Sequence, residues 1–307
     1  QGARVIRFPS RRALIFGGVL AAVGIGFVVW ASYFIFQTSF ENNDGVRRFC
    51  LFDDAMISMR YGWNLAHGDG LVWNPGERVE GFTNLLMTLY MAVWSALMSK
   101  SGAVLAVQIS GIGFALCAGV FAALVTRRLL EGTALAGSVL VPAVVMALSV
   151  FYYPLAYWSL LGMETGLLAA LISAAVFLAV RADRQTKLQR LLPVLLGLAF
   201  LTRPDSAVPV ALVFAYRALG LWRKPGFVRT LAIEAGIIAV FVAGVSIFRL
   251  AYYGSLTPNT YLLKMTGLDL AARIDNGLGF IELFLEETAI PIAIVVFAVI
   301  VDASRLR

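Results

Sequence analysis

Two adjacent carboxylates, Asp53 and Asp54, are the residues of this sequence best suited to chemistry. One of them could act as a general base on a hydroxyl group, or the pair could bind a cation. The alternative is structural, because acidic residues also stabilise the first turn of a helix. A helix is expected here, since apolar residues follow at near-helical spacing: Phe52, Ala55, Met56, Met59, Trp63 and Leu65. Gly68-Asp69-Gly70 ends this predicted amphipathic helix.

Acidic residues also occur at two later positions. Glu77 and Glu80 flank Arg78, and they either form ion pairs within a loop or bind substrate hydroxyls. Glu164 follows 32 residues without charge, 132–163. A carboxylate at the edge of such an apolar stretch indicates a functional site, unless it only caps the next helix.

Basic residues that could bind an anion lie further along the chain. Arg203 and Asp205 interrupt an apolar region, either as an internal ion pair or with the guanidinium bound to a phosphate. Lys264 could bind a phosphate or extend to lipid headgroups. Hydrogen-bonding side chains precede it, although the tyrosines among them could be interfacial: Tyr252, Tyr253, Ser255, Thr257, Asn259, Thr260 and Tyr261.

The composition shows which kind of protein positions these residues. Of 307 residues, 60% are hydrophobic and 14% are charged, whereas soluble domains carry about 25% charged residues. A soluble enzyme, a disordered chain and a disulfide scaffold are therefore excluded. We find no Gly-rich nucleotide motif. His67 is the only histidine, so a zinc site is not expected, and His67 is either a polar surface residue or a substrate contact.

Long uncharged stretches predict an all-α, polytopic membrane protein, with membrane lipids as its surroundings. About nine apolar segments occur, at 14–36, 83–98, 103–126, 134–152, 165–181, 187–202, 206–222, 230–250 and 284–301. The net charge of +7 comes from basic residues at the ends of these segments, which favours inner loops and lipid headgroups over nucleic acid.

The charge pattern also predicts orientation. Four arginines precede the first segment and favour a cytoplasmic N-terminus, while residues 37–80 hold seven acidic residues and four arginines. The loop 37–82 is therefore expected outside. Arg127-Arg128 should be cytoplasmic by charge, yet a count of crossings puts them outside unless segment 83–98 is re-entrant or segment 103–126 is broken. We give more weight to the charge pattern.

The sequence resembles bacterial GT-C glycosyltransferases, in particular the branch of mycobacterial terminal arabinofuranosyltransferases. The string from Asp53-Asp54 through Arg60-Tyr61, Asn64, His67-Gly68 and Asn74-Pro75-Gly76-Glu77 to Asn84 looks like the first outer loop of that family. Three further segments resemble the same branch, in the same order: Trp158 to Thr165, Leu201 to Asp205, and Tyr252 to Lys264.

This resemblance implies a multi-pass transferase of the bacterial plasma membrane whose active site faces outside. The donor would be a polyprenyl-phosphate sugar. Arabinofuranose is the sugar that the resemblance favours, and mannose or another sugar is the alternative. The acceptor would be a glycan or glycoprotein. Asp53 or Asp54 matches the catalytic acidic pair, and Arg203 and Lys264 match positions that face the donor phosphate. The other positions implied in substrate binding are Arg60, His67, Glu77, Glu80, Asn84, Glu164, Asp205, Tyr253, Asn259 and Tyr261.

Three questions stay open at this point. Metal dependence is the first: an acidic outer loop could hold Ca²⁺, Mg²⁺ or Mn²⁺, but no dedicated cage of ligands is visible. Residues 1–307 are expected to form one GT-C-like transmembrane domain, either of a short family member or of a longer protein truncated at its C-terminus. A transporter or a non-catalytic membrane subunit is the alternative to the enzyme, and a transporter would be expected to show ionisable groups at mid-membrane or an inverted repeat.

Overall fold

The computed structural model describes residues 10–181 and 187–305 of the chain. These residues are almost entirely helical, apart from a small antiparallel pair of strands, β1 (Phe40–Glu41) and β2 (Arg47–Arg48), in which Phe40 is opposite Arg48. The chain divides into two compact units, Gln1–Thr260 and Tyr261–Arg307. The second unit contains α12 (Leu270–Arg305), and α11 (Asn259–Met265) includes the boundary between the units.

Within the described residues, three helices are long and apolar enough to cross a membrane: α1 (Arg11–Gln37), α4 (Lys100–Leu129) and α10 (Phe227–Tyr253). A fourth crossing is formed if α5 (Leu140–Val150) and α6 (Tyr153–Leu160), which meet at a bend of 52°, act as one span. The predicted all-α polytopic fold is confirmed. Shorter helices complete the first unit: α2 (Asp53–Ala66), α3 (Leu85–Leu97), α7 (Thr165–Ala179), η1 (Lys187–Leu191), α8 (Leu192–Thr202), η2 (Pro204–Ser206) and α9 (Ala207–Leu221).

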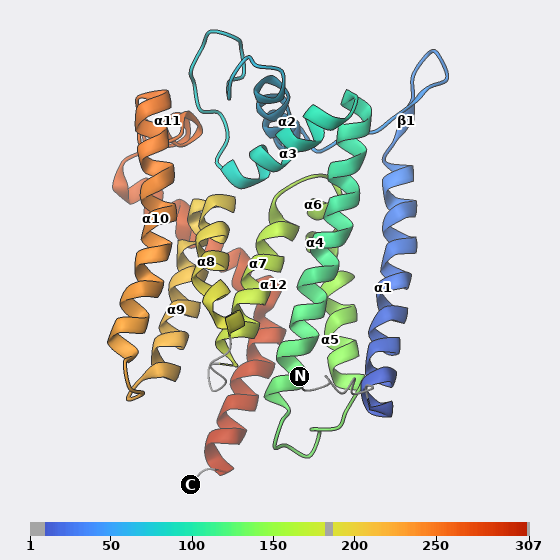
Figure 1. The fold of residues 1–307 in the computed structure, drawn as a ribbon, viewed down its shortest axis with the longest axis vertical. Coiled ribbons are helices and arrows are strands. Elements are labelled where there is room, and N and C mark those ends of the chain that lie inside the picture. Colours follow the sequence, from blue (N-terminus) through green and yellow to red (C-terminus); the bar gives the residue numbers. More distant parts are fainter. Residues whose placement is uncertain (1–9, 182–186, 306–307) are drawn as a thin grey trace, which may run out of the picture. The chain divides into compact units, whose positions relative to one another are not determined.

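The helix predicted from the spacing after Phe52 is α2, and it lies with α3 at one end of the bundle, which we call the loop end (Figure 1). Gly62 lets the two helices approach closely, because a Cβ atom there would lie 2.9 Å from the backbone nitrogen of Ala92. With 13 residues, α3 is about 20 Å long, whereas a bilayer core is about 30 Å thick. Segment 83–98 therefore does not supply a crossing of its own.

This arrangement resolves the conflict over Arg127-Arg128. The guanidinium of Arg127 lies 4.6 Å from the ring centre of Phe16, near the start of α1. The last turn of α4 and the first turns of α1 thus share the end opposite α2 (Figure 1), which we call the basic end. The charge pattern predicted this correctly, and the count of crossings that treated segment 83–98 as a span is wrong.

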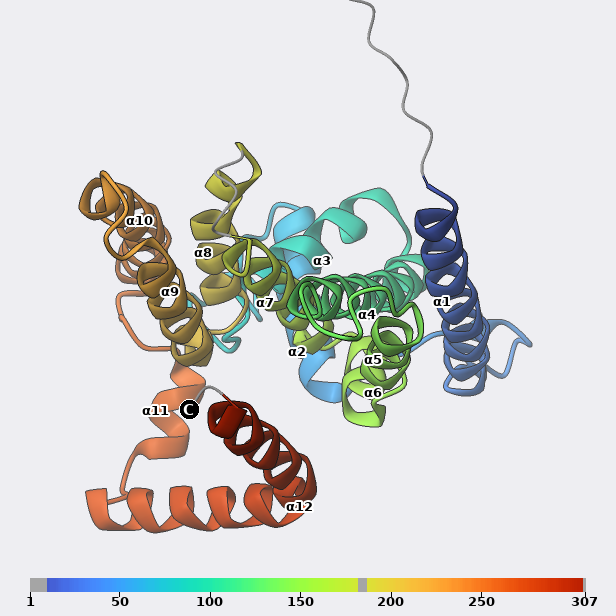
Figure 2. The ribbon, with the colours of Figure 1, turned by 90° about the horizontal axis from the view of Figure 1, so that it is seen from below.

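The helices that carry the site pack side by side, with α7 between α4 and α8 (Figure 2). Small residues permit this packing, because a Cβ atom on Gly111 of α4 or Gly166 of α7 would collide with Ser159 of α6. Helix α10 packs against α8, where Gly197 accommodates the ring of Phe241. As a result, the starts of α3 and α7 and the ends of α8 and α10 meet at the loop end (Figure 1).

Candidate active site

Glu164 is the centre of a buried polar network at the loop end. Its side chain is 2% exposed, and it immediately precedes α7. One carboxylate oxygen accepts a hydrogen bond from Nδ2 of Asn84 at 2.8 Å, and the other pairs with Nη1 of Arg203 at 2.9 Å. The carboxylate makes no capping hydrogen bond to α7, so its partners lie in other elements.

Asn84 is held in one orientation by its neighbours. Its Oδ1 atom accepts hydrogen bonds from the hydroxyls of Ser58 at 2.9 Å and Thr88 at 3.1 Å. Asn84, Ser58 and Thr88 are all buried. Because the Glu164 carboxylate only accepts hydrogen bonds, the amide nitrogen of Asn84 must face it while Oδ1 accepts from the two hydroxyls, so α2 and the start of α3 fix the position of the carboxylate that precedes α7.

Arg203 connects this network to solvent. Its Nε and Nη2 atoms donate to Asp205 at 3.0 and 2.9 Å, while Nη1 donates to Glu164. The side chain is 36% exposed and that of Asp205 is 65% exposed. The hydrogen bonds to Asp205 raise the pKa of the guanidinium, which therefore stays charged.

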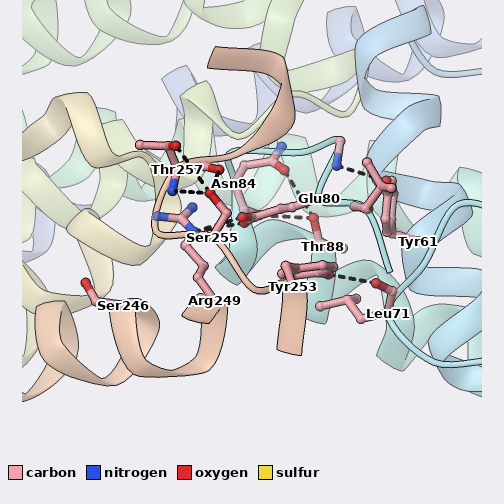
Figure 3. A network of polar contacts seen from close by, with 12 residues as sticks. Tyr61, Leu71, Glu80, Asn84, Thr88, Ser246, Arg249, Tyr253, Ser255 and Thr257 are labelled. Atoms are coloured by element: carbon pink, nitrogen blue, oxygen red, sulfur yellow. Dashed lines mark hydrogen bonds and ion pairs between the residues drawn. The ribbon is translucent and has the colours of Figure 1, made fainter. Parts of the chain in front are cut away.

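Glu80 forms a second buried ion pair (Figure 3), with Arg249 of α10. Both side chains are less than 10% exposed. Burial raises the pKa of the Glu80 carboxyl, although its hydrogen bond with Arg249 acts in the opposite direction. Glu80 and Glu77 had been expected either to pair with Arg78 or to bind substrate.

The prediction that Glu77 and Glu80 form ion pairs with Arg78 is wrong. The Arg78 guanidinium lies 4.8 Å from the ring centre of Tyr252, whereas Glu77 is exposed and accepts a hydrogen bond from Asn74 at 3.1 Å. Glu80 instead reaches α10, and its backbone carbonyl accepts the N–H of Asn259 at 3.0 Å. Glu80 and Asn259 therefore lie together.

Tyrosine hydroxyls form hydrogen bonds with the backbone of the loop between α2 and α3. The Tyr253 hydroxyl donates to the carbonyl of Leu71 at 2.7 Å (Figure 3), and the Leu71 N–H donates to the Tyr252 hydroxyl at 3.1 Å. Tyr61 donates to the carbonyl of Val79 at 2.8 Å and accepts from the N–H of Gly81 at 2.9 Å. Burial raises the pKa of the Tyr61 phenol, which stays protonated and holds both bonds at neutral pH.

Asp53 and Asp54 lie in the first turn of α2, where both are exposed. Asp53 accepts the backbone N–H of Asp54 at 2.9 Å. On the same helix, Nε of Arg60 donates to the carbonyl of Trp73 at 3.0 Å, and the His67 ring stacks on Trp63 at 4.0 Å. A cavity of about 290 Å³ adjoins this face of α2, lined by Met56, Met59, Arg60, Trp63, Asn64, Trp73, Lys100 and Val104.

This geometry does not give the place of two expected site residues, and it does not test whether a metal ion binds. Tyr261 and Lys264 belong to the second unit, so their place in the site stays a prediction. Across residues 10–181 and 187–305, no three His, Cys, Asp or Glu side chains are grouped so as to hold a metal ion.

The sequence analysis missed Arg249, Ser58 and Tyr61. Arg249 had a signal that could have revealed it, because it is a charged residue within the apolar segment 230–250. An ionisable residue in such a segment needs a partner. The same reasoning applies to Glu234, which pairs with Arg217 of α9 at 3.0 Å. Ser58 and Tyr61 had no comparable signal, since polar residues are expected on an amphipathic helix.

Fold and site together define a polytopic, all-α membrane protein with a buried polar network at one end of its bundle. The chain is similar to a glycosyltransferase, the terminal beta-(1->2)-arabinofuranosyltransferase of Mycobacterium tuberculosis (strain ATCC 25618 / H37Rv). The two are 31% identical over 229 residues, which are 69% of this chain and 34% of the relative. The chain thus spans about a third of the length of this curated relative. No family model matches the chain, and no solved structure matches it.

Proposed function

We propose that the chain carries the active site of a membrane glycosyltransferase. It transfers a sugar from a polyprenyl-phosphate donor to a cell-envelope glycan on the outer face of the bacterial plasma membrane. The sugar that we propose is arabinofuranose. The observation that carries this proposal is the similarity to a terminal arabinofuranosyltransferase. The buried network around Glu164 supports it, because a charged group positioned by three other elements is typical of a functional site.

The reaction needs few groups from the protein. The acceptor hydroxyl oxygen attacks the anomeric carbon, the bond from that carbon to the phosphate oxygen breaks, and polyprenyl phosphate leaves with the bonding electrons. The hydroxyl proton passes to a carboxylate, for which we propose Asp53 or Asp54. Phosphate is a good leaving group, so a cation near its oxygens is needed more than a strong general acid.

Arg203 is suited to the role of that cation. Its bonds to Glu164 and Asp205 use three of its five N–H groups, and the two that remain are on the atoms Nη1 and Nη2. A guanidinium matches the geometry of a phosphate. Because Glu164 is itself fixed by Asn84, Arg203 is oriented before the donor arrives, which reduces the reorganisation needed in the transition state.

The expected orientation follows from the distribution of charge. Arg11, Arg12, Arg127 and the loop between α9 and α10 lie at the basic end (Figure 1). By the positive-inside rule, the loop end with Glu164 and Arg203 then faces outside. Polyprenyl-linked sugars are the donor class suited to that side, since nucleotide sugars are made in the cytoplasm.

Asp53 and Asp54 could also bind Ca²⁺, Mg²⁺ or Mn²⁺ together with the donor phosphate. In that case a chelator abolishes transfer and one of these ions restores it. Transfer that is unaffected by a chelator assigns the two carboxylates to proton transfer alone.

The proposal is tested by sugar transfer with the purified protein in detergent, using decaprenyl-phosphate arabinofuranose and an arabinan acceptor. We expect turnover by the parent and a loss of about 10²–10⁴-fold in Asp53→Asn or Asp54→Asn. Asp44→Asn, in the β1–β2 turn, is the matched control for an exposed carboxylate and keeps full activity.

Other outcomes revise or overturn the proposal. Transfer from a mannose donor, with none from the arabinofuranose donor, would change the proposed sugar to mannose. The absence of both turnover and donor-induced thermal stabilisation overturns the proposal that the chain is an enzyme, because a donor that binds the folded state would raise the melting temperature. Full activity in both Asp variants would reject these carboxylates as the base.

A further inference from the structure

A second polar cavity lies at the basic end of the bundle, away from the site. It has a volume of about 200 Å³ and is formed by the last turns of α4, the turn after it, and the end of α7. Its lining combines charged and apolar side chains: Leu124, Arg127, Arg128, Glu131, Phe177 and Arg181. Nothing in the proposed transfer reaction uses these residues.

The arginines of this cavity are held in place by different partners. Arg128 pairs with Glu131. Arg127 and Arg181 instead lie over aromatic rings, at 4.6 Å from the ring centre of Phe16 and 5.1 Å from that of Phe177. Among residues 10–181 and 187–305, no carboxylate pairs with either of them.

The cavity is therefore suited to an anion. Among the described residues of its lining, three arginines and one glutamate give a net charge of +2. Stacking on a ring orients a guanidinium while its N–H groups remain available in the ring plane. One phosphodiester carries a single negative charge and two carry two, so the lining can neutralise either.

We infer that this cavity binds the phosphodiester headgroup of an anionic phospholipid in the leaflet at the basic end. A lipid is favoured over a soluble anion because Leu124 and Phe177 line the same cavity. Both belong to apolar helices, α4 being long enough to cross a bilayer. Basic cavities between helices at the cytoplasmic surface are typical binding sites for such headgroups.

The inference is tested by thermal unfolding of the delipidated protein in detergent. The added probes are phosphatidylglycerol, cardiolipin, phosphatidylcholine, and inorganic phosphate as the soluble anion. We expect both anionic lipids to raise the melting temperature more than phosphatidylcholine or phosphate does, because only a ligand of the folded state stabilises it. Equal effects of phosphatidylcholine and phosphatidylglycerol overturn the inference, and an equal effect of phosphate overturns the lipid part of it.

The variant Arg127→Gln/Arg181→Gln locates the site. Each basic residue at a membrane surface contributes about 1 kcal/mol to the attraction of anionic lipid, so the affinity for phosphatidylglycerol should fall about 30-fold. The control Arg223→Gln/Arg229→Gln removes the same charge from exposed positions at the same end. An equal loss in this control overturns the inference in favour of unspecific surface attraction.

A third variant covers the case in which the double variant does not fold. Leu124→Ala removes apolar lining without changing the charge, and it should weaken lipid binding while leaving phosphate binding intact; unchanged lipid binding would overturn the lipid part of the inference. The parent's preference for phosphatidylglycerol over phosphatidylcholine is measured without any variant. None of these measurements depends on glycosyl transfer, so failure here is distinct from failure of the proposed enzyme.

Discussion

Arg249 donates through Nε to both carboxylate oxygens of Glu80, at 2.9 and 3.1 Å, across 169 residues of sequence. The pair joins a membrane-spanning helix to the loop that precedes α3. Together with Asn259, Tyr252 and Tyr253, it fixes the end of α10 to that loop. This contact therefore serves the folding of the site rather than its chemistry.

Arg249→Met should destabilise the protein strongly. Removal of one partner from a buried ion pair leaves the other charge without compensation, which costs about 3–5 kcal/mol. Denaturant unfolding in detergent measures this change. The control Arg229→Met, at an exposed position on the same helix, should change the free energy of unfolding by about 0.5 kcal/mol or less. The double variant Glu80→Gln/Arg249→Met should be more stable than Arg249→Met alone.

The pH dependence of stability should report Glu80. Because burial raises the pKa of its carboxyl above the ordinary value of 4.5, the folded state holds this proton at pH values where the unfolded state has lost it. Stability relative to Glu80→Gln should therefore fall as pH rises from 4.5 through the raised pKa. The measurement is the difference in melting temperature between parent and Glu80→Gln as a function of pH. A difference that grows with rising pH would show that Arg249 lowers the pKa instead.

Glu164→Gln should impair catalysis more than stability. The amide keeps the shape of the side chain and can accept through its one oxygen from either Asn84 or Arg203, but it removes the charge that orients Arg203. If Arg203 binds the donor phosphate, kcat should fall about 10²–10³-fold, the range for loss of one positioned donor in a transition state. Thr88→Val serves as a comparison, because it removes a hydroxyl from Asn84 without changing charge. Unchanged kcat in Glu164→Gln would assign Glu164 a structural role.

Arg203→Lys distinguishes positioning from simple charge. Lysine keeps the positive charge but cannot make three directed hydrogen bonds to two carboxylates. We expect it to recover only a small part of the activity lost in Arg203→Gln. Full recovery would mean that the charge alone matters and that Asp205 and Glu164 do not orient it.

Gly62→Ala should loosen the contact between α2 and α3. The new Cβ atom would lie 2.9 Å from Ala92 N and 3.1 Å from the carbonyl oxygen of Thr88, both backbone atoms that cannot rotate away. A cost of about 1–3 kcal/mol is expected. At Gly26, where a Cβ atom meets nothing within 4 Å, the same substitution should stabilise α1 by about 0.5–1 kcal/mol. Amide exchange in α2 locates the effect.

Sequence periodicity and charge were sufficient to predict the helical membrane fold, α2, and that Arg127 lies at the same end of the bundle as the start of α1. Charge singled out Glu164, Arg203 and Asp205, and the family resemblance added Asn84. Neither predicted that these residues form one network, because contacts between residues 39 and 80 positions apart leave no local pattern. The Glu80 partner was missed for the same reason. The nearest opposite charge in sequence, Arg78, was chosen over a residue 169 positions away.

The shortness of α3 has a consequence for biosynthesis. A segment that returns to the side it came from reverses the direction in which every later helix is threaded through the bilayer. The insertion machinery must therefore release Leu85–Leu97 without carrying it across, although its residues are apolar enough to be mistaken for a span. Lengthening this helix by two turns would create a crossing and invert the sidedness of α4 and of all that follows it, including Glu164 and Arg203.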